Sequence, residues 1–439
     1  MNRDVSKERT HNYIRQIKGS VVYKGLAVVL SFFAIPLMIR YLGQEQFGVW
    51  STLLSIMSWI VFFDLGLGNG LRNKLAESIA RNEFHEASRY ISSAYSLIGL
   101  ISALSFTLLT ISAFFIPWQR VFNTHTLPEL TLRYTVIMAG FFVFVNFWVS
   151  LINQVLNAVQ KTSVVVFGQF FSNALSLFFV FILTKTTNSS LFYMATLYGI
   201  SLITSNVLLS IWFYRQSGEL LPGFSLDRQH IRPLLSLGLQ FFTIQIAVLL
   251  IFTTDKMLIT QLFGPQYVTQ YDVVFKLFSI ITIIHSLVNA PLWSSYTDAY
   301  HRGDITWIKI IMRKQLMIFV SIIFAVLILM LVTKPVISMW IGKDIEVSNA
   351  LVISVGAFVL ISTWNNIYAS IVNGTGMIKL QLITSIMAMV INVPLAIILV
   401  KYFGLGVYGV VLATCISLFL FAIVGPVQVY FILNRIRVS

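Results

Sequence analysis

Eight ionisable residues lie inside long apolar stretches of this chain, where charge is rare and costly. Four of them are basic: Lys24, Arg40, Lys256 and Lys276. The other four are three carboxylates and one imidazole: Asp64, Asp255, Asp272 and His285. Basic groups at membrane depth can hold a phosphate by charge and hydrogen bonds, and partly buried carboxyl and imidazole groups can bind protons. We therefore interpret the first four as candidates for binding a phosphate-bearing substrate and the second four as candidates for coupling or gating.

Simpler interpretations remain open for several of these residues. Asp272 and Lys276 are four positions apart, so they can pair with each other on one helix face. Arg40 ends an apolar stretch, where a cation is favoured by the helix dipole or reaches the headgroups. Lys24 lies about one turn inside the opposite boundary, and its side chain can reach the headgroups in the same way.

Asp64 and His285 occupy equivalent positions in an internal repeat, because 285 minus 64 is 221, about half of the 439 residues. Both are expected in the inner third of the membrane. One hypothesis is a proton-sensitive latch between the two halves. The alternative is that each residue caps or hydrogen-bonds its own span end.

No known catalytic or metal-binding pattern accompanies these residues. The single cysteine, Cys415, lies in an apolar run, so the sequence predicts no disulfide and no cysteine-based metal site. The run Asp64–Gly70 contains three glycines but lacks the Gly-Lys-Ser/Thr ending of a phosphate-binding loop. These glycines are expected to end a helix, to act as a hinge or to let two backbones approach closely. We predict no cofactor, no metal and no enzymatic activity.

The elements that must position these residues are membrane-spanning helices. Hydrophobic residues make up 57% of the 439 residues, charged residues only 10%, and the mean hydropathy is +0.84. A span needs about 20 apolar helical residues, and the sequence contains about twelve such stretches, starting with 19–42 and 47–67. The net charge of +14 comes from small basic groups between apolar runs, which argues against nucleic-acid binding.

The constant offset of about 220 residues predicts two six-helix bundles. Gly43 and Gly264 differ by 221 positions, as do Leu71 and Leu292. We predict bundles at 1–213 and 233–439, joined by a cytoplasmic linker at 214–232. An even number of spans in each half gives both halves the same orientation, so a pseudo-two-fold axis along the membrane normal should relate them, with the functional site near their interface.

The basic residues also predict the orientation. With twelve spans both termini lie on one side, and only nine of the 30 Lys and Arg residues fall on the other side, which leaves 21 (30 minus 9). The positive-inside rule therefore places both termini in the cytoplasm.

Two stretches resemble a known family. Phe62–Glu77 (FFDLGLGNGLRNKLAE) and Ala290–Asp304 (APLWSSYTDAYHRGD) are similar to polysaccharide-export flippases, in particular the O-antigen translocase branch of the multidrug/oligosaccharidyl-lipid/polysaccharide exporter superfamily. The six-plus-six layout extends this similarity over the whole chain. The resemblance implies a bacterial inner-membrane protein whose first, second, seventh and eighth spans line a cationic cavity.

It also implies the cargo, an undecaprenyl-pyrophosphate-linked oligosaccharide moved from the inner to the outer leaflet by alternating access for surface polysaccharide biosynthesis. The implied partners are this lipid-linked oligosaccharide, membrane lipids and other polysaccharide-assembly proteins, without nucleic acid. Two alternatives stay open. A cation-coupled multidrug antiporter of the same superfamily would need an acidic cavity, and a membrane-embedded polysaccharide polymerase or ligase would need a larger outer loop.

Overall fold

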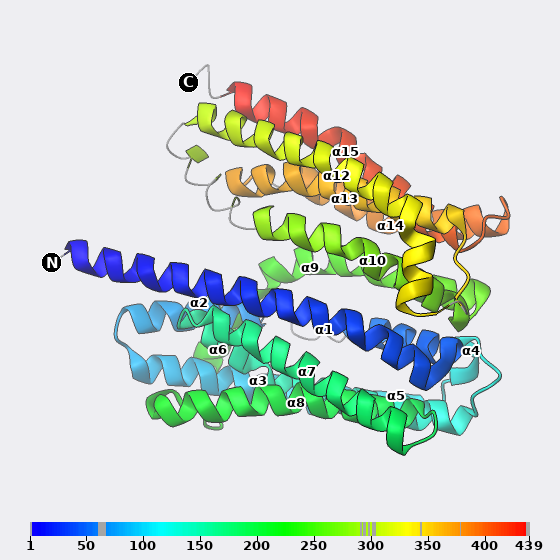
Figure 1. The fold of residues 1–439 in the computed structure, drawn as a ribbon. Coiled ribbons are helices and arrows are strands. Elements are labelled where there is room, and N and C mark those ends of the chain that lie inside the picture. The colour runs from blue at the N-terminus through cyan, green and yellow to red at the C-terminus, as the bar shows by residue number, and fades with distance from the viewer. Residues whose placement is uncertain are drawn as a thin grey trace. The chain divides into compact units, whose positions relative to one another are not determined.

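The protein is helical throughout the part of the chain that the structure describes (Figure 1). This computed structural model describes residues 2–59, 67–289, 292, 296, 299–300, 304–342, 345–377 and 379–435, with the backbone alone for 2–18, 69, 80, 236–252, 287 and 435. Ten of the described helices are long and apolar enough to cross a membrane. The predicted all-α, multi-pass membrane fold is confirmed.

The chain divides into two compact units, residues 1–246 and 247–439, and the division falls within one long helix, α9 (Arg228–Phe263). The N-terminal unit also contains α1 (Asn2–Ser58), α2 (Leu67–Ala80), α3 (Phe84–Ala113), α4 (Trp118–Phe122), α5 (Glu129–Val149), α6 (Leu151–Ala158), α7 (Thr162–Thr186), α8 (Leu191–Gln216) and the 3-10 turn η2 (Gly218–Leu220). The C-terminal unit also contains α10 (Pro265–Asn289), α12 (Ile305–Trp340), α13 (Asn349–Thr375), α14 (Lys379–Lys401) and α15 (Val407–Arg435).

Two glycines mark the internal repeat in the backbone itself. The first predicted span and the start of the second fall within α1, which is broken at Gly43 by non-helical backbone (φ 75°, ψ 171°). Gly264, 221 positions later (264 minus 43), separates α9 from α10 with φ 107°. Because a positive φ is strained for any residue with a Cβ, the two equivalent glycines each allow a break in the helical backbone, one within α1 and one between α9 and α10.

The core of the N-terminal unit forms where α2, α3 and α6 meet α8 and the start of α9. Leu71, Ile91, Ile152 and Phe213 are fully or almost fully buried there. A Cβ on Gly70 would collide with the backbone carbonyl oxygen of Leu234 at the start of α9. The last glycine of the run 64–70 therefore permits a close approach of α2 to α9, which is one of the roles that the sequence left open for these glycines.

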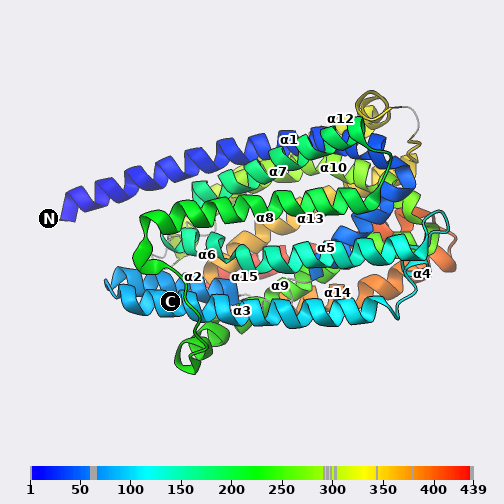
Figure 2. The same ribbon diagram turned by 90° about the horizontal axis from the view of Figure 1, so that it is seen from below.

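Three helices of the same unit, α1, α7 and α8, lie side by side (Figures 1 and 2). Small residues bring α7 and α8 together, because the Ser205 hydroxyl of α8 donates to the Gly168 carbonyl of α7 at 2.6 Å. Gly19 of α1 faces Ser163 of α7 just as closely, so a Cβ there would lie 3.1 Å from the serine Cβ. Close contact between small residues of this kind is typical of helix packing in membranes.

The segment between η2 and α9 packs against α3. The backbone N–H of Gly223 donates to the Ser92 hydroxyl, and that of Ser225 donates to the Ser96 hydroxyl, both at 2.9 Å. Of the predicted linker 214–232, the ends belong to α8 and α9, and the part between them lies along α3, held by main-chain hydrogen bonds to two serines one turn apart.

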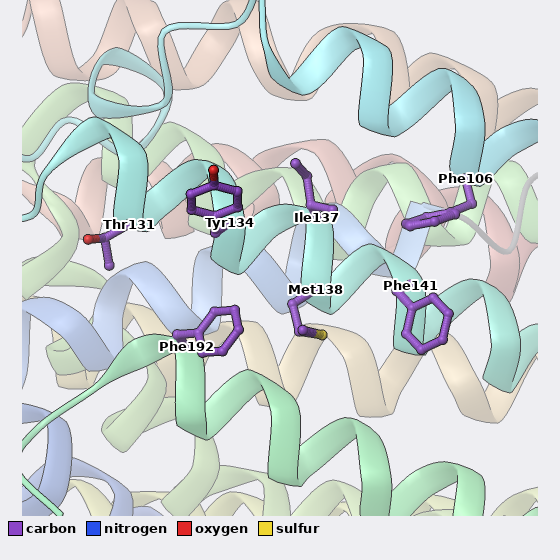
Figure 3. Close-up of a pocket in the computed structure, with 7 residues that line it drawn as sticks. All are labelled: Phe106, Thr131, Tyr134, Ile137, Met138, Phe141 and Phe192. Carbon is purple, nitrogen blue, oxygen red and sulfur yellow. The ribbon is translucent and has the colours of Figure 1, made fainter.

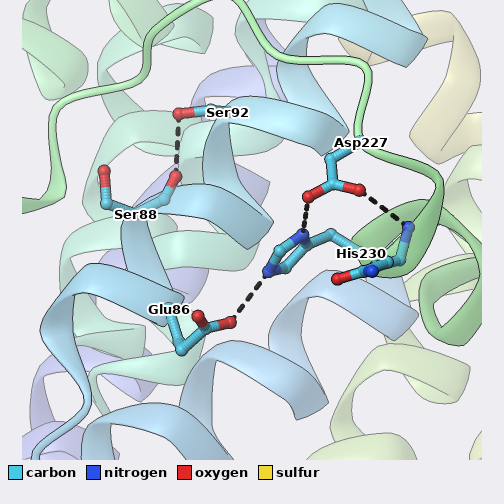
Figure 4. Close-up of polar contacts among 6 residues, drawn as sticks. Glu86, Ser88, Ser92, Asp227 and His230 are labelled. Carbon is cyan, nitrogen blue, oxygen red and sulfur yellow. Dashed lines mark hydrogen bonds and ion pairs between the residues drawn. The ribbon is translucent and has the colours of Figure 1, made fainter.

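His230 secures the end of this segment to α3 (Figure 4). Its imidazole is buried between two carboxylates, with Nδ1 2.8 Å from Asp227 and Nε2 2.8 Å from Glu86. The ring of Tyr90 packs edge-on against the imidazole at 4.8 Å. The Asp227 carboxylate also accepts from the backbone N–H of Gln229, and this bond and His230 lower the pKa of Asp227 below its usual value of 3.8.

The C-terminal unit has its own core, which involves α12, α13 and α15. Ile308, Ile367, Ile371 and Val429 are almost completely buried in it, together with Tyr296. Helices α14 and α15 pack against each other along their length, and α13 packs against α10, α12 and α15. This packing places polar residues of α14 and α15 opposite α9.

Candidate functional site

Seven of the eight candidate residues lie in the described part of the chain, and Asp64 lies outside it. Lys24 and Arg40 belong to α1, where both side chains are exposed. The other five lie on α9 and α10 of the C-terminal unit: Asp255, Lys256, Asp272, Lys276 and His285. Most of the candidate chemistry is therefore gathered on two consecutive helices.

Asp255 forms the centre of a buried polar cluster. Its side chain is only 4% exposed, and the Thr414 hydroxyl of α15 lies 3.0 and 3.2 Å from its two carboxylate oxygens. The Asn392 amide of α14 donates in turn to the Thr414 hydroxyl oxygen at 3.3 Å. Both partners are 1% exposed. Three helices thus enclose one carboxylate with neutral hydrogen-bonding groups.

No ion pair to Asp255 occurs among the described residues. A carboxylate buried without a cationic partner is costly in free energy unless a proton or a metal cation neutralises it. The hydroxyl and amide oxygens around Asp255 are also ligands that hard cations accept. The cluster (Asp255, Asn392 and Thr414) therefore has the chemistry of a small cation site.

The neighbouring residue, Lys256, forms an ion pair across helices. Its Nζ lies 2.8 Å from Asp272 Oδ1 of α10, and both side chains are largely shielded. The sequence left open a pair between Asp272 and Lys276 on one helix, and the ion pair with Lys256 additionally joins α10 to α9. Lys256 and Asp272 therefore neutralise each other in this structure, while Lys276, one turn further along α10, remains half-buried.

His285 is almost completely buried inside the C-terminal unit, which the sequence pattern alone did not indicate. The side chain is 2% exposed and lies beside Gln315 of α12, which is 3% exposed. One turn further along α10, Asn289 donates to the Asn366 backbone carbonyl of α13 at 3.2 Å. His285 Nε2, Asn289 Oδ1 and Gln315 Oε1 are buried polar atoms without a hydrogen-bond partner among the described residues. This region is the second polar cluster of the unit.

The apolar grooves of the N-terminal unit have a different character. One groove of about 680 Å³ lies between α3, α5 and α8 and is lined by Phe106, Thr131, Tyr134, Ile137, Met138, Phe141 and Phe192 (Figure 3). None of these side chains is charged. The groove suits hydrocarbon, and its lining residues offer no cation to hold a phosphate.

The sequence analysis missed Asn392 and Thr414. Neutral polar residues are common in the spans of this chain, so nothing distinguished these two before their helices were placed. Residue spacing could have suggested only that Asn392 and Thr414, 22 positions apart, lie on consecutive helices. Among the described residues no group of three or more His, Cys, Asp or Glu side chains could hold a metal ion.

The fold is that of multi-pass membrane transporters. Over 96% of its length the chain is similar to an inward-facing multidrug resistance MATE family transporter of the MOP superfamily, with a TM-score of 0.79, 15% identity and 99% of that chain covered. It is also similar to a MOP superfamily transporter from Pyrococcus furiosus whose binding pocket has reversed polarity, with a TM-score of 0.62 and 15% identity over 96% of each chain. At this identity the similarity concerns the fold alone.

Residues 19–296 match the family described as polysaccharide biosynthesis protein, and the chain belongs to this family. A protein of Salmonella typhimurium provisionally named an O-antigen transporter is 23% identical, with 88% of each chain covered. A protein of Yersinia pseudotuberculosis provisionally named an O-antigen export protein is 19% identical, with 81% of each covered. The predicted resemblance is confirmed, and the chain is a multi-pass membrane transporter.

Proposed function

We propose that this transporter moves an undecaprenyl-pyrophosphate-linked oligosaccharide from the inner to the outer leaflet by alternating access, for surface polysaccharide or O-antigen biosynthesis. The observation that carries this proposal is the set of cationic side chains at membrane depth in a chain of the polysaccharide biosynthesis family. Its relatives with provisional O-antigen transport names point to the same class of cargo.

The cationic residues are proposed to hold the pyrophosphate. Lys24 and Arg40 are exposed on α1 and form no ion pair with any described residue. Lys276 adds a third positive charge on α10. Lys256 can join them only when its pair with Asp272 opens, so substrate binding would exchange a carboxylate for a phosphate at this lysine.

The Asp255 cluster is proposed to couple transport to an ion gradient. Binding of a proton or sodium ion would neutralise the buried carboxylate and favour one arrangement of α9, α14 and α15 over another. A cation can shift the equilibrium between inward-open and outward-open states only if it binds more tightly to one state than to the other. Asp272 and His285 are the further coupling candidates on α10, and Asp64 completes the set named from the sequence.

The proposed location is the bacterial inner membrane with both termini in the cytoplasm, in agreement with the distribution of basic residues. In this orientation the linker of residues 214–232 and the His230 contacts lie on the cytoplasmic side. The lipid-linked cargo is then collected where it is synthesised.

A leaflet-accessibility assay tests the function directly. Purified protein is reconstituted with a lipid-linked oligosaccharide, and the sugar exposed on the distal leaflet is measured with no gradient, a proton gradient or a sodium gradient. We expect a rate above that of protein-free vesicles, increased by one gradient and reduced in Lys24→Gln and Arg40→Gln. Lys185→Gln at the outer end of α7 serves as the matched control.

Two outcomes would favour the competing functions. Gradient-driven uptake of cationic drugs without movement of the lipid-linked sugar would indicate a multidrug antiporter. In cells, accumulation of single repeat units on the outer leaflet would indicate a polymerase, whereas the proposed function predicts their accumulation on the inner leaflet.

A further inference from the structure

A second groove of the N-terminal unit, separate from the proposed cargo and coupling residues, has a cation at one end. It lies between α1, α7 and α8, with a volume of about 550 Å³, within the range of small-molecule sites. Its walls are aromatic: Tyr23 of α1, Phe167 and Phe171 of α7, and Trp212 of α8. Tyr23 and Phe167 meet edge to face at 5.2 Å, which keeps the wall together.

Lys161 marks the mouth of this groove. Its ammonium lies 4.9 Å from the centre of the Trp212 ring and 5.5 Å from that of Phe213. Lys161 precedes the first turn of α7, where the helix dipole disfavours a cation. Arg215, in the last turn of α8, is exposed at the same end. Neither cation forms an ion pair with a described residue.

The dimensions of the groove match one leaflet. Phe171 lies ten positions after Lys161, which corresponds to about 15 Å along α7. This length is half of the roughly 30 Å hydrocarbon core. A tryptophan and a lysine together are typical of the headgroup level. The distribution of basic residues orients this end of α7 and α8 toward the cytoplasm. The groove therefore extends from the inner headgroups to about the middle of the membrane.

We propose that this groove binds an anionic phospholipid of the inner leaflet. One acyl chain lies between α1, α7 and α8 against Phe167 and Leu208, and the headgroup phosphate meets Lys161 and Arg215. Basic pockets between membrane helices on the cytoplasmic side are suited to anionic headgroups. The small floor of the groove, formed by Gly168 and Ser205, leaves room for the chain. This site uses none of the residues proposed to hold the cargo, and its Tyr23 directly precedes one of them, Lys24.

Native mass spectrometry of the full-length protein tests the proposal with phosphatidylglycerol and phosphatidylethanolamine of identical acyl chains. We expect wild type to retain phosphatidylglycerol preferentially. In Lys161→Gln the ratio of retained phosphatidylglycerol to phosphatidylethanolamine should fall about fivefold. The matched control is Lys185→Gln, because Lys185 also lies over an aromatic ring, Phe181, but at the other end of α7. It should leave the preference unchanged.

A second variant tests the chain-binding part. Leu208→Trp fills the groove and should release the retained lipid, whereas Leu104→Trp on an exposed position of α3 outside it should not. A melting curve for each variant confirms that the protein is folded. Equal retention of the two lipids by wild type, or no effect of Lys161→Gln, would overturn the proposal. The proposal would also be overturned if undecaprenyl phosphate displaced phosphatidylglycerol at concentrations below that of phosphatidylglycerol, because the groove would then bind the polyprenyl phosphate in preference.

Discussion

The Thr414 hydroxyl is the only described side chain that donates directly to Asp255, so its removal tests the coupling proposal most sharply. Thr414→Val keeps the volume of the side chain and deletes its donor. A buried charged acceptor that loses a hydrogen bond costs about 1–3 kcal/mol, which corresponds to about a 5- to 150-fold change in the affinity of a coupled ligand.

The sign of the effect identifies the ion. The variant destabilises the ion-free carboxylate, so a proton, which needs no further ligand, should bind more tightly by that factor. A sodium ion loses an oxygen ligand with the hydroxyl and should bind more weakly. The assay is the proton or sodium concentration that gives half-maximal stimulation of leaflet transfer in reconstituted vesicles.

Two controls make the experiment decisive. Thr414→Ser retains the hydroxyl and should behave as wild type within about a factor of two, since one methyl group is a small change. In an Asp255→Asn background, which should abolish stimulation by the gradient, Thr414→Val should have no further effect, as expected for residues that act through one contact. If Thr414→Val left both ion dependences unchanged, or if Asp255→Asn retained full stimulation, the coupling role of this cluster would be refuted.

Three further predictions concern contacts outside that cluster. Asp272→Asn and Lys256→Met should each lower the free energy of unfolding by about 1–3 kcal/mol, because each removes one side of a shielded ion pair, and the double variant should be milder than either in detergent denaturation. Because folding lowers the pKa of Asp227, the ionised carboxylate stabilises the docked linker. This stabilisation is complete above pH 3.8 and is lost as the pH falls through the lower pKa of the folded state. Hydrogen exchange of residues 217–227 should therefore accelerate at pH 3. Gly70→Ala should reduce folded protein severely, because its Cβ would meet the Leu234 carbonyl, and detergent size-exclusion yield against a Gly218→Ala control measures this.

Much of the fold could be predicted because membrane helices follow from local chemistry. A long apolar stretch must satisfy its backbone hydrogen bonds internally, so its length alone predicts a helix. The repeat likewise predicted that Gly43 and Gly264 are equivalent, and both have positive φ. The close approach at Gly70 followed from the absence of a side chain. Each of these features depends on the composition of one stretch or on the type of one residue.

The polar contacts of the site could not be predicted in the same way. Spacing within α10 gives no sign that Asp272 forms an ion pair with Lys256, because the rotation of α9 about its axis brings that lysine within 2.8 Å. Helix rotation is set by packing over the whole unit and not by spacing within one span. The partners of Asp255 are neutral residues from α14 and α15, and only their position opposite α9 distinguishes them from other polar residues.

The position of these partners in the chain has a consequence for ion choice. The polysaccharide biosynthesis match ends at residue 296 and includes Asp255, whereas Asn392 and Thr414 lie beyond it. A buried carboxylate alone can accept a proton, but sodium also requires oxygen ligands at defined distances. The residues that would decide between the two ions are therefore on α14 and α15, which supply the hydroxyl and the amide beside the carboxylate of α9. Replacing Asn392 and Thr414 together by apolar residues should leave a site that responds to protons and not to sodium, while the cationic residues of α1 continue to hold the cargo.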